Sequence, residues 1–129
     1  AGGHIDIDEL QRLKAAHDDS EAEHLLVCLH HPPVAMDSDW LESVGLENRE
    51  EFQAAIRRCD KTRGVLFGHV HQAVDTHIDD ILICGTPSTC SQFKPGSRLF
   101  AMDDKPPAYR RVILHADGQI ESELVWVRK

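Results

Sequence analysis

The stretch VLFGHVH at residues 65–71 decides the fold, because a short apolar run ends there in two histidines. A second stretch, LLVCLHHPP at residues 25–33, has the same order of apolar and histidine residues. Each pattern predicts a buried strand that stops and presents histidines at its C-terminal end. In layered α/β proteins, ligands bind in the crevice outside the C-terminal ends of the strands. We therefore expect two neighbouring strands to bring His30, His69 and His71 to one point.

Composition indicates a single globular domain over residues 1–129, with 41% hydrophobic and 28% charged residues. The net charge of -8 argues against nucleic acid as a partner, because nucleic-acid binders need a basic face. No apolar run approaches the ~20 residues of a membrane span, and the first residues lack the pattern of a signal peptide. Cys28 and Cys84 lie inside apolar runs and no C-x-x-C pair occurs, so we expect free thiols and a reducing, cytoplasmic location.

The order of the predicted elements indicates an α/β (α+β) chain. Residues 6–16 and 48–59 have helical spacing and begin with capping boxes, and each helix precedes one of the two histidine-bearing strands. The second half predicts antiparallel hairpins over residues 73–84 and 109–127, the latter with an Asp-Gly turn. We therefore expect parallel strands with crossover helices, followed by antiparallel hairpins.

Histidine is the commonest metal ligand among neutral side chains, and the chain has nine. Spacing alone leaves metal binding and a structural role equally open for the two motifs, since His-x-His is weak evidence. Gly68 strengthens the case, because a glycine permits positive φ or close backbone approach in a tight ligand loop. The other histidines lie in polar or alternating contexts and are interpreted as surface or structural residues: His4, His17, His24, His77 and His115.

The two histidine motifs resemble the last two motifs of the calcineurin-like metallophosphoesterases. The surrounding sequence is similar to the bacterial 3′,5′-cyclic AMP phosphodiesterases of the Icc (CpdA) type over nearly the whole chain. The stretches that carry this similarity are WL at 40–41, GLEN at 45–48, GHVHQ at 68–72, TPSTC at 86–90, QFKP at 92–95 and LHADG at 114–118. The resemblance implies a metal-dependent phosphodiesterase whose most favoured substrates are 3′,5′-cyclic nucleotides.

The resemblance also implies a four-layer αββα sandwich with two metal ions at the strand ends, drawn from iron, manganese and zinc. By the same resemblance, His30 and His69 hold one ion and His71 holds the other. His31 occupies a variable position of the motif and is not expected to be a ligand. Two such ions would neutralise the phosphate and provide the attacking hydroxide.

The chain departs from the family in its carboxylates. The family's early Asp-x-His, its Gly-Asp and its Gly-Asn-His motif are missing, so no recognisable group bridges two ions. Aspartates that are conceivable substitutes, but are interpreted as turn or surface residues, are Asp37, Asp39, Asp75 and Asp103. Catalytic and substrate-binding residues therefore stay unassigned.

These departures predict the C-terminal half of a longer metallophosphoesterase domain, inactive by itself, rather than a naturally short protein. The alternative is a catalytically incomplete module that oligomerises or binds metal. Half a sandwich leaves strand edges and apolar faces uncovered, so we expect a homo-oligomer, with domain swapping as one route to it.

Overall fold

The computed structural model describes residues 2–128, and its central feature is a four-stranded mixed sheet in the order β1-β2-β4-β3. Three strands run parallel, namely β1 (Leu25–Leu29), β2 (Thr62–Phe67) and β4 (Ile81–Gly85). Strand β3 (Val74–Ile78) forms the antiparallel hairpin with β4 that the sequence predicts. The three parallel strands therefore end at one edge of the sheet, where the histidine motifs begin.

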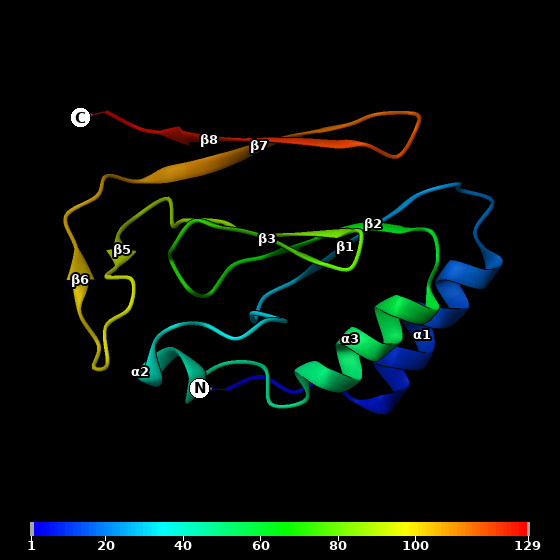
Figure 1. The fold of residues 1–129 in the computed structure, drawn as a ribbon, viewed down its shortest axis with the longest axis horizontal. Helices are drawn as coiled ribbons and strands as arrows, with labels where there is room; N and C mark the ends of the chain where they lie inside the picture. The colour runs from blue at the N-terminus through cyan, green and yellow to red at the C-terminus, as the bar shows by residue number, and fades with distance from the viewer. Residues whose placement is uncertain (1, 129) are drawn as a thin grey trace.

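Helices cover one face of this sheet (Figure 1). Helix α1 (Ile7–Asp19) packs against α3 (Arg49–Arg58), the crossover between the parallel strands β1 and β2. Apolar residues at helical spacing, such as Phe52 and Ile56, are buried with the inward-facing side chains of the sheet. The short helix α2 (Asp39–Glu42) lies before α3 in a segment for which the sequence indicated no regular structure.

A β-hairpin covers the opposite face of the sheet (Figure 1). Its strands are β7 (Ala108–Leu114) and β8 (Ile120–Trp126), paired antiparallel as predicted. Two short strands, β5 (Gln92–Phe93) and β6 (Met102–Asp103), pair with each other beside the sheet. Helices, sheet and hairpin thus form three layers, which confirms the mixed α/β class with parallel strands followed by antiparallel hairpins. No helix among residues 2–128 is long and apolar enough to cross a membrane.

One arginine fastens the hairpin to the sheet. The Arg110 side chain is only 3% exposed, and its Nη1 lies 2.8 Å from Asp75 Oδ1 on β3. Its Nη2 donates to the carbonyl of Gly85 at the end of β4, at 2.9 Å. The guanidinium therefore joins three strands of two different layers through charge-assisted hydrogen bonds.

The helix starts predicted from capping boxes are confirmed, with Asp6 and Asn48 at the N-cap positions, but the capping hydrogen bonds themselves are wrong. Neither Asp6 nor Asn48 makes a side-chain cap hydrogen bond. Asn48 instead accepts from the Ile5 amide at 3.0 Å and donates to the Ile5 carbonyl at 2.8 Å. The amide side chain thus pairs with the backbone of the N-terminal segment and ties that segment to the start of α3.

The prediction of two buried strands holds for β2 and is wrong for β1. Strand β2 has neighbours on both sides, and Val65 is fully buried. Strand β1 is an edge strand, so its residues are mostly half-buried, and Cys28 is exposed rather than packed as a small hydrophobe. An apolar edge strand without charged or proline residues is open to pairing with another chain.

Thiol reactivity should divide the four cysteines into two classes. Cys59 and Cys84 are buried and Cys28 and Cys90 are exposed, all as free thiols. Burial raises the pKa of both Cys59 and Cys84, which keeps them protonated and slow to react. We expect two equivalents of a chromogenic disulfide reagent to react quickly in the folded protein and two more only after denaturation. Four fast equivalents would contradict the burial of the inner pair.

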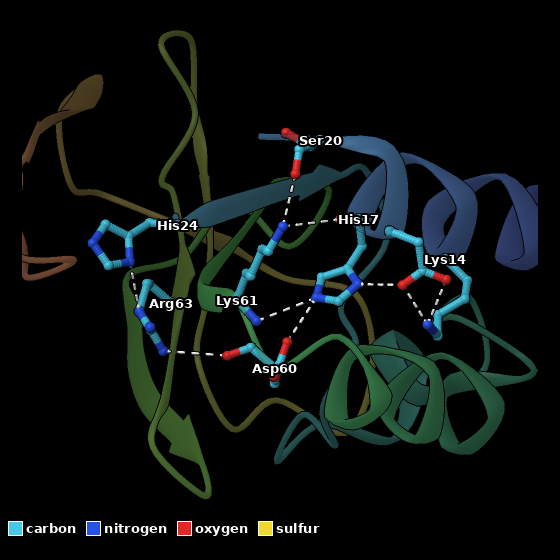
Figure 2. A network of polar contacts seen from close by, with 8 residues as sticks. Lys14, His17, Ser20, His24, Asp60, Lys61 and Arg63 are labelled. Atoms are coloured by element: carbon cyan, nitrogen blue, oxygen red, sulfur yellow. Dashed lines mark hydrogen bonds and ion pairs between the residues drawn. The ribbon is translucent and has the colours of Figure 1, made fainter. Parts of the chain in front are cut away.

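A polar network connects the end of α1 with the start of β2 (Figure 2). His17 is buried, and its ring nitrogens contact Asp18 at 2.8 Å and Asp60 at 2.9 Å. Lys61 Nζ donates to the carbonyl of Ser20, the C-cap residue of α1, at 2.7 Å. Hydrogen bonds from Lys14 and then His17 lower the pKa of Asp18. His17 therefore has the structural role that its sequence context indicated.

Candidate metal centre

The two histidine motifs meet because their strands are parallel neighbours. His30 follows β1 and His69 follows β2 after one glycine, so both leave the same edge of the sheet. The Gly68 amide donates to the His30 carbonyl at 3.1 Å, which extends the strand pairing into the loops. The expectation that neighbouring strands deliver histidines to one place is met for this pair.

His30 and His69 are in direct contact. His69 Nδ1 lies 3.2 Å from His30 Nε2, so one of these nitrogens donates and the other accepts. His31, which the sequence did not mark as a site residue, joins them: its ring centroid is 4.5 Å from that of His69 and 5.0 Å from that of His30. We call these three residues the histidine cluster.

His71 makes a different set of contacts. Its Nδ1 lies 2.9 Å from the Ser91 carbonyl, which can only accept, so Nδ1 carries a proton and Nε2 is the nitrogen left for a ligand. Its ring stacks on Phe93 with centroids 4.1 Å apart and planes 3° apart. The carbonyl and the phenyl ring therefore fix both the tautomer and the orientation of this imidazole.

The loop that carries His69 and His71 has an uncommon backbone. His69 and His71 have φ values of 67° and 49°, in the left-handed region that non-glycine residues rarely occupy. Val70 between them is fully buried and anchors the loop in the core. Gly68 is not among the positive-φ glycines, and a Cβ there would meet only His30 Nδ1 at 3.9 Å, so neither positive φ nor close approach explains this glycine. The two histidines adopt that conformation themselves.

Burial favours the neutral form of His69. Removal of its ring from water is the main reason that the pKa of His69 lies below its usual value, and repulsion by His31 and His30 adds to this. A neutral imidazole is the form that binds a metal ion.

A glycine close to the N-terminus makes room for the cluster. A Cβ at Gly3 would lie 2.3 Å from His31 Nδ1, so no larger residue fits there without displacing the ring. Gly3 is held in place by backbone hydrogen bonds with Gly45 and Glu47, at 2.9 and 2.8 Å. The spacing of the sequence gave no signal for this contact.

The carboxylates lie elsewhere. Asp39 pairs with Arg98, Asp75 with Arg110 and Asp103 with Lys105, while Asp37 is exposed. The one late Asp-x-His, residues 75–77, is part of β3 and uses its aspartate for the Arg110 ion pair. Within residues 2–128, no group of three or more His, Cys, Asp or Glu side chains is arranged to hold a metal ion.

His30 and His69 therefore fit as two ligands of one metal ion, but the side chains around them do not form a complete metal centre. Two imidazole nitrogens bound to one tetrahedral zinc ion lie about 3.3 Å apart, because each Zn–N bond is ~2.0–2.1 Å long. The 3.2 Å between His30 and His69 matches this separation. The proton on His71 Nδ1, donated to a backbone carbonyl, is the arrangement usual for a metal-ligating histidine.

The chain is similar to bacterial cyclic nucleotide phosphodiesterases along most of its length, as the resemblance read from its sequence indicated. It is 38% identical to the 3′,5′-cyclic adenosine monophosphate phosphodiesterase CpdA of Pseudomonas aeruginosa over 120 residues, which cover 93% of this chain and 44% of the relative. It is 34% identical to CpdA of Escherichia coli over 116 residues, 90% of this chain and 42% of the relative.

A further relative is a 3′,5′-cyclic-nucleotide phosphodiesterase of Nostoc, 40% identical over 93 residues, 72% of this chain and 35% of the relative. No protein-family profile matches the chain. The chain thus spans less than half the length of each of these three relatives.

Proposed function

From the premise that this chain is related in sequence to part of the bacterial CpdA-type cyclic AMP phosphodiesterases, we propose that it supplies one half of a phosphodiesterase. The whole enzyme hydrolyses 3′,5′-cyclic nucleotides, with cyclic AMP as the favoured substrate. The helix–sheet–hairpin layers correspond to the C-terminal half of a four-layer αββα sandwich.

One observation carries this proposal: the contact between His30 and His69 at the ends of two parallel strands. Two histidines from separate loops place ring nitrogens 3.2 Å apart, with His69 Nδ1 facing His30 Nε2. With a proton on one of the two nitrogens they form a hydrogen bond, and with both unprotonated their lone pairs would point at one shared cation. The relatives supply the class of reaction that such a cation would serve.

The site would take two ions from the set iron, manganese and zinc, with His30 and His69 on one ion and His71 on the other. When bound, such ions neutralise the phosphate oxygens and lower the pKa of water. The chain's own part is to present ring nitrogens: partial burial favours the neutral form of His69, and the bond from His71 Nδ1 to Ser91 orients the His71 ring. The carboxylates that bridge two ions would come from the other half of the enzyme.

Hydrolysis of cyclic AMP with added manganese tests the function. We expect this chain alone to be inactive, because its histidines lack carboxylate partners. We expect activity when it is mixed with a polypeptide that carries the early Asp-x-His, Gly-Asp and Gly-Asn-His motifs of a relative. No activity in the mixture, together with manganese binding by the chain alone, would favour the alternative of a catalytically incomplete metal-binding module.

We further propose that this chain pairs with a second copy through the β1 edge, either directly or by domain swapping, when its other half is absent. The edge is apolar and open, and the outer hairpin also exposes Ile113 and Leu114. Light scattering after size exclusion should give a mass above the 14.5 kDa of one chain. Cys28→Lys places a charge on the edge and should yield monomer, whereas Cys90→Lys should not. A monomeric parent protein would contradict this association.

A further inference from the structure

Three aromatic rings lie against the candidate metal centre, and the proposed chemistry leaves them unused. Trp40, Phe93 and Phe100 contact one another edge to face, with centroids 5.1 to 5.3 Å apart. We call them the aromatic cluster. Phe93 is also the ring on which His71 stacks, so a single ring separates His71 from Phe100.

The aromatic cluster is partly open to solvent. Phe100 is 60% exposed and its neighbour Leu99 is 79% exposed, although both are large apolar residues. Trp40 and Phe93 are half-buried. Burial in the core therefore does not account for Phe100, and an exposed aromatic ring beside a polar site is a surface on which a planar ligand can stack.

The loop that carries Phe100 is held in position. Ser38 Oγ, at the start of α2, donates to the Ser97 carbonyl at 2.5 Å, and Arg98 Nε lies 3.2 Å from Asp39. The Lys94 amide donates to the Ala101 carbonyl at 2.8 Å, which closes the loop at its base. These bonds fix Phe100 against Trp40 before any ligand arrives, and such preorganisation lowers the entropic cost of binding.

One positive charge beside the rings also suits an anion. Lys94 lies on the same loop as Phe100 and is exposed, whereas Arg98 of that loop is paired with Asp39. A nucleotide places its base and its phosphate on opposite sides of one sugar. A phosphate near His71 would therefore bring the base to the aromatic cluster, beside Phe93 and Phe100.

We propose that the aromatic cluster is a stacking platform for the purine base of the nucleotide whose phosphate lies at the histidines. This proposal rests on the proposed function and adds the base-binding subsite to it. Stacking is tolerant of base identity because every base has a π-face, so the platform itself accepts adenine and guanine alike, and a preference of the whole enzyme for cyclic AMP would come from contacts outside it.

Fluorescence of Trp40 tests the platform without metal or catalysis. The chain has two tryptophans, and Trp126→Phe leaves Trp40 as the reporter. In the presence of a chelator, AMP and GMP should quench Trp40 with affinities within a few fold of each other, whereas ribose 5-phosphate should not. Base–aromatic stacking predicts a loss of affinity of about 5- to 150-fold for Phe100→Ala.

Matched variants distinguish the loss of base stacking from a general change in the structure of the loop. Phe100→Tyr keeps an aromatic ring and should retain most of the affinity, and Leu99→Ala, one position away, should change it less than about twofold, since it removes no ring. Equal binding by Phe100→Ala and its parent would overturn the platform. Equal quenching by AMP and ribose 5-phosphate would also overturn it, as would a strong preference for one purine. Quenching of Trp40 when the protein is concentrated without ligand would assign the rings to self-association instead.

Failure of this proposal differs from failure of the proposed function. In the assembled enzyme, normal hydrolysis with an unchanged KM in Phe100→Ala would reject the platform and retain the phosphodiesterase. Base-dependent quenching in a protein that never hydrolyses cyclic AMP would retain the platform and reject the phosphodiesterase.

Discussion

Replacement of His69 by alanine is expected to lower cyclic AMP hydrolysis by the assembled enzyme by more than about 100-fold. Residues that only orient a metal ligand cost 10- to 100-fold when mutated, and loss of a ligand itself costs more. His69 is the residue of choice because its Nδ1 faces His30 Nε2 at 3.2 Å and partial burial lowers its pKa, which favours the neutral ring. The measurement is kcat/KM with manganese, together with manganese binding by calorimetry on the chain alone.

His77→Ala is the matched control for this experiment. His77 lies on β3, is exposed and pairs with Leu82 near the start of β4, whereas the histidine motifs follow the ends of β1 and β2. We expect its replacement to leave hydrolysis and manganese binding within about twofold of the parent, as for most surface substitutions. Equal losses in both variants, or full activity in His69→Ala, would reject the ligand assignment of His69.

Replacement of Arg110 by methionine is expected to lower the free energy of unfolding by about 2 to 3 kcal/mol. Loss of one partner of a buried ion pair costs roughly 3–5 kcal/mol, but Asp75 is 55% exposed and water screens part of that cost. The carbonyl of Gly85 also loses its donor. Urea unfolding followed by circular dichroism measures the change.

The neighbouring arginine provides the control. Arg111 pairs with Glu123 across the hairpin, at 3.2 Å, and is 59% exposed. An exposed pair of this kind contributes about 0 to 1 kcal/mol, so Arg111→Met should stay within that range. If both variants lost the same free energy, Arg110 would not be the residue that fastens the hairpin to the sheet.

Sequence patterns gave the fold class and the order of elements because apolar periodicity and turn residues act locally. The bounds of β1 and of the two strands of the Asp-Gly hairpin were predicted to within a residue or two. Burial of β1 could not be predicted, because a run of apolar residues looks the same in a central strand and in an edge strand. The capping boxes failed for a similar reason, since Asn48 found a partner 43 positions away at Ile5.

Within the candidate metal centre, the local sequence pattern predicted His30, His69 and His71 and none of the residues around them. The contact between His30 and His69 follows from strand order, which the alternation of helices and strands suggested. The role of Gly3 under His31, and of Ser91 and Phe93 around His71, depends on loops packed from distant parts of the chain. No rule of sequence spacing connects such residues. The similarity of QFKP to the phosphodiesterases included Phe93, but it did not predict that Phe93 stacks on His71.

The left-handed backbone of the histidine loop has a consequence for how this sequence can vary. Holding His69 and His71 at positive φ costs of order 1 kcal/mol each, and glycine or asparagine would bear that conformation more easily. Mutational drift toward greater stability would therefore remove the very ring nitrogens that face the site. These two positions are a local stability–activity trade-off, because the residue that bears the backbone strain also carries the ring nitrogen proposed to bind a metal ion.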